Sequence, residues 1–372
     1  MGESSTSDRT RNIDVEMVMR ALLVILAVVL LVDLVRRLVT GDVTISGVLV
    51  LVKDGLMRGL VIGLAGIGLS MTYSILNFAN FAHGDYITAG AFSGWATTYT
   101  IAGGFGSAAN IGSLVLVGAG GSVFGGALGI NTFATPLAVI IGLLVAGAFT
   151  IVLALVMDRF VFKPIRDSGG IPLLITSIGL AFALRYSILF VFGSGTRGVT
   201  NTGTLPGIRP YFIDGQVPLT FHDLVLVVVA GGLMLGVHVL LQFTKLGKAM
   251  RAMSDDESLA RITGIATERV IRATWLIGGG LTGVSGFMFV LWKGTISWND
   301  GWLLLLLIFA AVILGGIGSV YGAIVGGLVI GLTASTAVIW IPSGFARAAA
   351  FLVMILVLVA RPQGIFAGRS TA

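Results

Sequence analysis

The sequence contains no cysteine and few charged residues, and both absences narrow what the protein can be. Without cysteine there is no disulfide, no thiolate metal site and no cysteine nucleophile. Charged residues make up 11% of the 372 positions, whereas soluble domains carry roughly 25%. A soluble chain that is 56% hydrophobic could not cover its surface with polar groups, so we predict an integral membrane protein.

Motifs for catalysis are also missing. The sequence has no GxxxxGKS/T nucleotide loop, no HExxH zinc motif and no GxSxG elbow. Its three histidines, His83, His222 and His238, lack the spacing of metal ligands. We therefore expect no cofactor, no metal site and no enzymatic activity in this chain. The net charge of +6 is typical of the positive-inside bias of membrane proteins, so no nucleic-acid partner is expected.

Long apolar runs are the main feature that is present. About 20 apolar residues span a bilayer, and the 54 glycines suit close helix packing. We predict an all-α, polytopic transmembrane helical bundle of about ten spans, with eight as the alternative, and with broken or re-entrant segments. The candidate spans are residues 18–35, 55–76, 84–101, 135–157, 171–192, 222–243, 271–291, 303–316, 320–340 and 345–360.

Two segments do not fit this pattern. Residues 44–54 are expected to lie in the membrane interface. The Gly-rich stretch 103–130 fits a loop, a re-entrant segment or a weak helix.

Basic residues predict the orientation of the bundle. Lys and Arg gather in residues 158–170, in residues 244–272 and at the C-terminus, and they are sparse in residues 193–221 and 292–302. Because cytoplasmic loops are enriched in Lys and Arg, the first three regions are predicted to be cytoplasmic. Residues 1–17 are polar and lack a cleavage site, so we expect a cytoplasmic tail rather than a signal peptide.

The longest cytoplasmic loop contains a short helix with clear end signals. Ser254 is a good N-cap, and Glu257 three residues later completes a capping box. Gly264 suits the position just after the helix. Leu259 and Ile262 are spaced to share one face. The sequence therefore predicts a capped helix of about nine residues here.

Such a short helix is marginal by itself, so it is expected to dock on something. One interpretation is that it packs on its own membrane domain. The other is that it is a coupling helix, seated in a groove on a cytoplasmic ATPase that moves it as a rigid body. The residues assigned to that contact are Arg251, Ser254, Asp255, Asp256, Glu257, Leu259, Arg261, Ile262 and Gly264.

Polar or glycine residues interrupt the apolar pattern in residues 77–85 and 314–322. Polar groups are costly in hydrocarbon, so those of the first segment must face protein, a cavity or the cytoplasmic boundary. Each segment is either a tight turn between helices or a break that lines the translocation path. The candidate path residues are Asn77, Asn80, His83, Asp85, Gly315, Gly316, Gly318 and Ser319.

Arg185 and His238 are lone ionisable residues inside predicted spans. Such residues are functional hypotheses by default. Both lie within two turns of a predicted boundary, so we expect their side chains to snorkel to the interface.

Four segments follow one another over most of residues 50–368: NFANFAHGDYITAGAF, GKAMRAMSDDESLARITGI with ATERVI, AAVILGGIGSVYGAIVGGLVIGL, and RPQGIFAG. Together they resemble the permease subunits of branched-chain (hydrophobic) amino acid ABC importers. The resemblance implies a permease domain over residues 55–368. It leaves residues 18–54 as an additional N-terminal helix with an interfacial segment.

The resemblance also implies a multi-pass protein of the cell membrane with several partners. A second homologous permease pairs with the chain in the lipid bilayer, and ATP-binding-cassette ATPase subunits contact residues 251–264. An extracytoplasmic binding protein delivers the substrate to outer loops such as 193–221 and 292–302. The implied substrates are hydrophobic amino acids such as leucine, isoleucine and valine, with urea or short amides as an alternative.

Other classes of membrane protein fit less well. A secondary transporter driven by an ion gradient needs carboxylates at helix breaks, and Asp85 is the one good candidate. A membrane enzyme needs paired catalytic acids or metal ligands, which the predicted spans do not offer.

Overall fold

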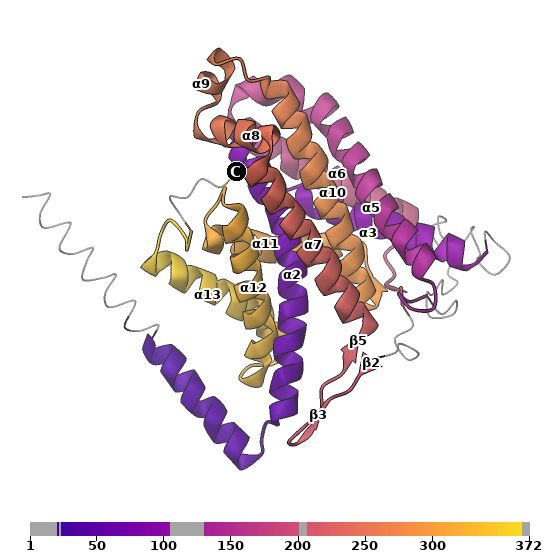
Figure 1. Ribbon diagram of the computed structural model, residues 1–372, viewed down its shortest axis with the longest axis vertical. Coiled ribbons are helices and arrows are strands. Elements are labelled where there is room, and N and C mark those ends of the chain that lie inside the picture. The colour runs from indigo at the N-terminus through magenta and orange to yellow at the C-terminus, as the bar shows by residue number, and fades with distance from the viewer. Residues whose placement is uncertain (1–20, 22–23, 105–129, 201–206, 367–372) are drawn as a thin grey trace, which may run out of the picture.

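Long apolar helices packed side by side make up the computed structural model, which describes residues 21, 24–104, 130–200 and 207–366 (Figure 1). A helix over residues 24–40 comes first. The elements that follow are α2 (Ile45–Leu76), α3 (His83–Ala102), α5 (Pro136–Met157), η1 (Asp158–Phe162), η2 (Lys163–Ser168), α6 (Gly170–Phe192), α7 (Phe221–Phe243), α8 (Lys245–Asp255), α9 (Glu257–Ile262), α10 (Thr267–Lys293), α11 (Asp300–Gly315), α12 (Val320–Thr336), η3 (Ala337–Ile339), η4 (Ser343–Phe345) and α13 (Ala346–Ala360).

Three short antiparallel strand pairs join the helices at one end of the bundle. They are β1 (Arg197–Gly198) with β6 (Thr295–Ile296), β2 (Gly207–Ile208) with β5 (Leu219–Thr220), and β3 (Tyr211–Phe212) with β4 (Gly215–Gln216). The β3–β4 hairpin is attached to the start of α2, because the Asp214 carboxylate accepts the backbone N–H groups of Ile45 and Ser46. The N–H of Ser46, above all, lowers the pKa of Asp214.

The predicted all-α membrane bundle is confirmed, with fewer full spans than expected. In the described part of the chain seven helices are long and apolar enough to cross a bilayer. The other three candidate spans are not counted among these seven. Residues 18–35 are described only in part, and α3, although 20 residues long, is not among the helices that are apolar enough. Helix α11 has 16 residues and is about 24 Å long, which is shorter than the hydrocarbon core of a bilayer.

The centre of the bundle is α2, which packs closely against α12. Gly59 of α2 faces Gly331, where an added Cβ would lie 2.4 Å from the Gly59 nitrogen. Gly63 faces Gly327 in the same way, at 2.5 Å. These two contacts leave no room for side chains, so the glycines bring the backbones of α2 and α12 together.

Residues 44–54 do not form a separate segment, because α2 starts at Ile45 and continues without a break to Leu76. Their place at the membrane interface stays a prediction. Two charged residues, Lys53 and Asp54, lie in this part of α2. The Lys53 ammonium lies 3.2 Å from the Asp54 carboxylate and 3.4 Å from that of Asp223 on α7. The predictions for residues 1–17 and for most of residues 103–130 lie outside the described residues.

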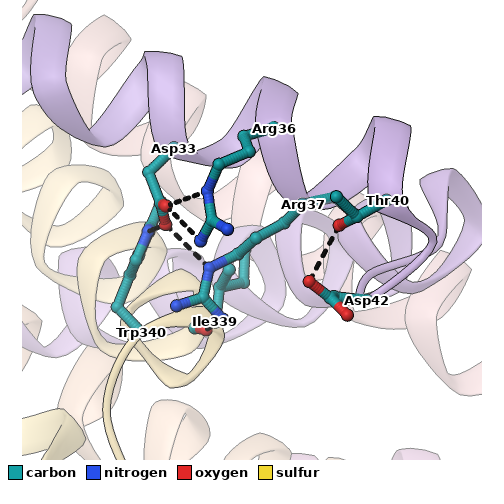
Figure 2. Close-up of polar contacts among 7 residues, drawn as sticks. All are labelled: Asp33, Arg36, Arg37, Thr40, Asp42, Ile339 and Trp340. Atoms are coloured by element: carbon teal, nitrogen blue, oxygen red, sulfur yellow. Dashed lines mark hydrogen bonds and ion pairs between the residues drawn. The ribbon is translucent and has the colours of Figure 1, made fainter.

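The helix over residues 24–40 is attached to the bundle by a polar cluster (Figure 2). Asp33 accepts hydrogen bonds from Arg36 at 2.8 Å and from Arg37 at 2.7 Å. It also accepts the indole N–H of Trp340 at 3.1 Å, and Arg37 donates to the carbonyl of Ile339. Asp33 therefore joins this additional N-terminal helix to the turn after α12.

The segments rich in Lys and Arg meet at one end of the bundle, opposite the strands (Figure 1). Lys163 and Arg166 of η2 each lie 2.9 Å from the carboxylate of Glu268 at the start of α10. Arg166 also lies 2.7 Å from Asp158. The two basic segments that were predicted to be cytoplasmic are thus on the same side.

The N-terminal turns of α3 and α11 cross with almost no space between them. A Cβ added to Gly301 would lie 1.9 Å from the carbonyl oxygen of Gly84. The Thr88 hydroxyl accepts the N–H of Gly301 at 3.1 Å. This contact fixes where the two helices begin relative to each other.

We expect Gly301→Ala to destabilise the protein, by about 2 kcal/mol or more, because the new methyl group collides with the backbone of α3. Thermal unfolding of the detergent-solubilised protein measures this as a lower midpoint. Gly344→Ala is the matched control, since nothing lies within 4 Å of a Cβ added there. Equal midpoints for the two variants would contradict the close crossing.

Candidate functional site

The turn between α2 and α3 returns into the bundle instead of ending at its surface. The imidazole Nε2 of His83, the first residue of α3, lies 3.0 Å from the carbonyl oxygen of Ala65. Ala65 precedes the end of α2 at Leu76 by eleven residues, which corresponds to roughly 16 Å along the helix axis. Helix α3 therefore begins deep inside the apolar bundle, which favours the helix-break interpretation of residues 77–85.

Local hydrogen bonds shape this turn. Asn77 ends α2 in the left-handed conformation, with φ of 53°, and its N–H donates to the carbonyl of Tyr73. The amide oxygen of Asn80 accepts the N–H of Ala82 at 3.1 Å. The Ser177 hydroxyl of α6 accepts the N–H of Phe81. The N–H groups of Asn77, Phe81 and Ala82 are thus bonded to protein groups, as the membrane interior requires.

Asp85 forms a buried ion pair with Arg185 of α6. The two N–H···O contacts from the guanidinium to the carboxylate each measure 3.0 Å, and the side chains are 7% (Arg185) and 0% (Asp85) exposed. The guanidinium also lies 4.1 Å from the ring centre of Trp302 on α11. The prediction that Arg185 snorkels to the interface is therefore wrong.

His238 also has a partner inside the protein. Its Nδ1 contacts the Tyr321 hydroxyl of α12, which Gln242 of α7 also reaches, at 3.3 Å. No local feature of the sequence indicates either pair, since the partners are 83 residues apart for His238 and 100 apart for Arg185. Only the packing of helices distant in the chain brings them together.

Residues 314–322, the second interrupted segment of the apolar pattern, form a tight turn between α11 and α12. Gly316 and Gly318 have φ of 106° and 87°, which only glycine adopts readily. The Ser319 hydroxyl caps α12 by accepting the N–H of Gly322 at 3.0 Å. The N–H of Ile365 donates to the carbonyl of Leu314 and closes the turn from the C-terminal side. The geometry favours the tight-turn interpretation over a re-entrant break.

The predicted helix in the loop 244–272 exists as α9, with different N-terminal details. Asp256, and not Ser254, is its N-cap, and its carboxylate accepts the N–H of Leu259 at 2.9 Å. Ser254 belongs to α8, and its hydroxyl contacts that of Ser74 near the end of α2. The capping box from Ser254 to Glu257 is thus wrong, and Glu257 instead pairs with Arg261 at 2.9 Å.

The C-terminal end of α9 is as predicted. Gly264 has φ of 86°, and its N–H donates to the carbonyl of Arg261. The N–H of Ile265 donates to the carbonyl of Ala260, which completes a Schellman motif. Both ends of this six-residue helix are therefore fixed by hydrogen bonds.

The residues assigned to the ATPase contact differ in their exposure. Leu259 and Ile262 are 58% and 83% exposed on the outer face of α9. Asp255, Asp256, Arg261 and Gly264 are also exposed. Arg251 is half-buried and donates to the amide oxygen of Gln242 at 3.1 Å, so it holds α8 to α7.

We expect Arg185→Gln and Asp85→Asn each to lower stability by about 3–5 kcal/mol, because each leaves an unpaired charge buried. The double variant is expected to recover much of that loss, since both charges are gone. Thermal unfolding of the four proteins in detergent gives the coupling between the two sites. Ser187→Ala, on the exposed side of α6, is the control, and strictly additive losses would count against the buried pair.

Comparisons with known proteins place the chain in a family of transport proteins. Residues 51–360 match the family model described as "Branched-chain amino acid transport system / permease component". The high-affinity branched-chain amino acid transport system permease protein LivH of Escherichia coli K12 is 27% identical over 318 residues, which is 84% of this chain and 93% of LivH. The corresponding protein BraD of Pseudomonas aeruginosa is 26% identical over 317 residues, with the same coverage.

A third relative is similar over a shorter part of the chain. A probable branched-chain amino acid transport permease protein LivH of Methanocaldococcus jannaschii is 33% identical over 140 residues, which is 36% of this chain and 44% of that protein. The family model covers most of the chain, from α2 to α13. The chain therefore belongs to the permease component family of branched-chain amino acid transport systems.

Proposed function

We propose that the chain is the membrane-spanning permease subunit of an ATP-binding-cassette importer for branched-chain and other hydrophobic amino acids. The names of LivH and BraD support this substrate class. An extracytoplasmic binding protein delivers the amino acid, a second homologous permease completes the membrane part, and separate ATPase subunits drive transport. On this proposal residues 55–368 form the permease domain, residues 18–54 are an addition to it, and both termini are cytoplasmic.

The observation that carries the proposal is the exposed apolar face of α9. A six-residue helix in water is unstable unless its ends are fixed, and α9 has an Asp256 cap and a Schellman motif. Leu259 and Ile262 nevertheless project from it with no cover among the described residues. A helix with hydrogen-bonded ends and solvent-exposed apolar side chains is suited to bind in a groove on a partner. This is what we expect of a helix that couples the permease to an ATPase.

Helix α9 is connected to the central helix α2 through α8. Helix α8 is packed on the bundle through Met250 and Met253, which are both buried. The Ser254 hydroxyl at its end contacts Ser74 of α2. ATP-driven closure of the ATPase pair would push α9 and α8 as one unit, and α2 would follow. Alternating access to the two sides of the membrane then results from rigid-body motion.

We expect the double variant Leu259→Asp with Ile262→Asp to abolish ATP-driven leucine uptake while leaving the permease folded. The two carboxylates face water in the isolated subunit, but they would be unpaired and desolvated in the groove of the ATPase. The assay is uptake of radiolabelled leucine by proteoliposomes that hold the complete importer, with ATP inside and the binding protein outside. Elution of the variant during size-exclusion chromatography checks its fold.

Lys248→Asp is a suitable control, because it places a carboxylate on the neighbouring helix α8 and away from the apolar face of α9. Full uptake by the Leu259 and Ile262 variant would remove the coupling assignment. Concentrative uptake that depends on an ion gradient and not on ATP would instead reject the importer class.

A further inference from the structure

A charged cavity lies between α2, α10, α11 and the segment leading into α13. Its volume is about 280 Å³. Arg58, which lines it, precedes the end of α2 by eighteen residues, so it lies about 27 Å along the helix from the end that contacts α8. The cavity is thus in the half of the bundle that faces away from α9.

Two arginines in this cavity form no close ion pair, although Asp54, one turn before Arg58 on α2, also attracts that guanidinium. In the described part of the chain no carboxylate lies within 4 Å of the guanidinium of Arg58 or of Arg347. The third cation of the cavity, Lys293, is already neutralised, because its ammonium lies 2.7 Å from the Asp300 carboxylate. Asp300 also accepts the N–H of Ser297 at 2.9 Å, so its oxygens are occupied. The unpaired guanidinium groups give the cavity an excess of positive charge.

The environment of Arg58 increases its attraction for an anion. Its side chain is half-buried, and the guanidinium lies 5.9 Å from the ring centre of Trp292. Fewer water molecules therefore compete for its N–H groups than at an exposed arginine. A planar guanidinium binds a carboxylate through two parallel hydrogen bonds, a geometry that an ammonium group cannot provide.

Apolar side chains also line the cavity. They are Leu303, Leu304 and Leu307 of α11 and Phe289 of α10. Drug-sized ligands occupy pockets of about 300–1,000 Å³, so a cavity of about 280 Å³ suits a smaller solute. A lining that combines positive charge with leucine side chains matches a small molecule with a carboxylate at one end and an aliphatic group at the other.

A second cavity provides an approach from the strand-bearing end. Its volume is about 370 Å³, and it shares Arg58, Trp292 and Lys293 with the first. Thr220 and Asp223, at the start of α7, line its other side. Thr220 ends β5, so the approach opens beside the loops that we assign to docking of the binding protein.

We propose that the first cavity is the site where this permease receives its amino acid. Arg58 and Arg347 bind the α-carboxylate, and the leucine wall of α11 contacts the aliphatic side chain. The inference rests on the proposed import of hydrophobic amino acids, and it adds the residues that select a free carboxylate. A solute with the same side chain but a neutral amide in place of the carboxylate is then a poor ligand.

Ligand binding to the purified complete importer tests the site directly. Titration with L-leucine or 4-methylpentanoate is expected to change the fluorescence of Trp292 in a saturable way. L-Leucinamide, which lacks the carboxylate, is expected to bind at least tenfold more weakly. The Trp292→Phe variant should lose the signal, which assigns the change to this tryptophan among the six.

Substitution of the arginines tests their role. Arg58→Gln with Arg347→Gln should raise the apparent Kd for L-leucine at least tenfold and remove the preference over L-leucinamide. Arg58→Lys should restore only part of the affinity. Arg159→Gln is the matched control, because it removes the same charge from an exposed position at the cytoplasmic end and should bind leucine as the wild type does.

A second variant does not depend on the arginines. Leu303 is half-buried and lines the cavity, so the larger side chain of the Leu303→Phe variant should reduce the space for the ligand. The affinity for L-leucine should then fall at least tenfold relative to that for L-alanine. Unchanged leucine binding in this variant and in the double arginine variant would overturn the site.

Uptake measurements separate this inference from the proposed function. If the wild-type importer accumulates leucine with ATP and the arginine variant does so with the same KM and the same preference, the site is wrong and the function stands. If the wild type fails to transport leucine at all, the proposed function is wrong. Saturation of the Trp292 signal by phosphatidylglycerol vesicles, with no response to leucine, would assign the arginines to a lipid headgroup and reject the proposal.

Discussion

Backbone polar groups that enter the hydrocarbon need partners inside the protein, and the turn between α2 and α3 shows how far this constraint shapes the bundle. The turn begins at Asn77, at the end of α2, and the side chain of His83 beyond it reaches Ala65, roughly 16 Å from that end along the helix axis. Ser177 and Arg185 of α6 and Ala65 of α2 supply the partners of this region. Because Gly301 allows α11 to approach Gly84, the same region also fixes the start of α11. A short α11 and a deeply placed α3 are therefore consequences of one buried break.

Helix α2 connects the two ends at which function is proposed. Arg58 lies on it beside the amino acid cavity, and Ser74 near its end contacts α8. Its glycines hold it against α12 without side chains between the backbones. Close backbone packing of this kind resists bending, so a displacement at α8 is transmitted along α2 and α12 together and not absorbed locally.

Features that depend on neighbours in the chain could be predicted from the sequence, and features that depend on distant helices could not. Apolar runs located the spans, and Gly264 marked the end of α9. The N-cap was displaced from Ser254 to Asp256 because Ser254 has a tertiary partner, Ser74, which local rules do not include. Arg185 lay near a predicted boundary, and nothing in its surrounding sequence indicated that Asp85 would approach it from α3.

The pairing of Asp85 also bears on the source of energy. A transporter driven by an ion gradient needs a carboxylate that is free to bind and release the ion within the membrane. Asp85 was the one good candidate in the sequence, and in the structure both of its oxygens accept hydrogen bonds from Arg185. Releasing it would leave a guanidinium unpaired beside Trp302, which is costly in an apolar environment. The buried pair therefore acts as a fixed structural contact. The exposed face of α9 is the better candidate for the contact that couples ATP hydrolysis to movement of the bundle.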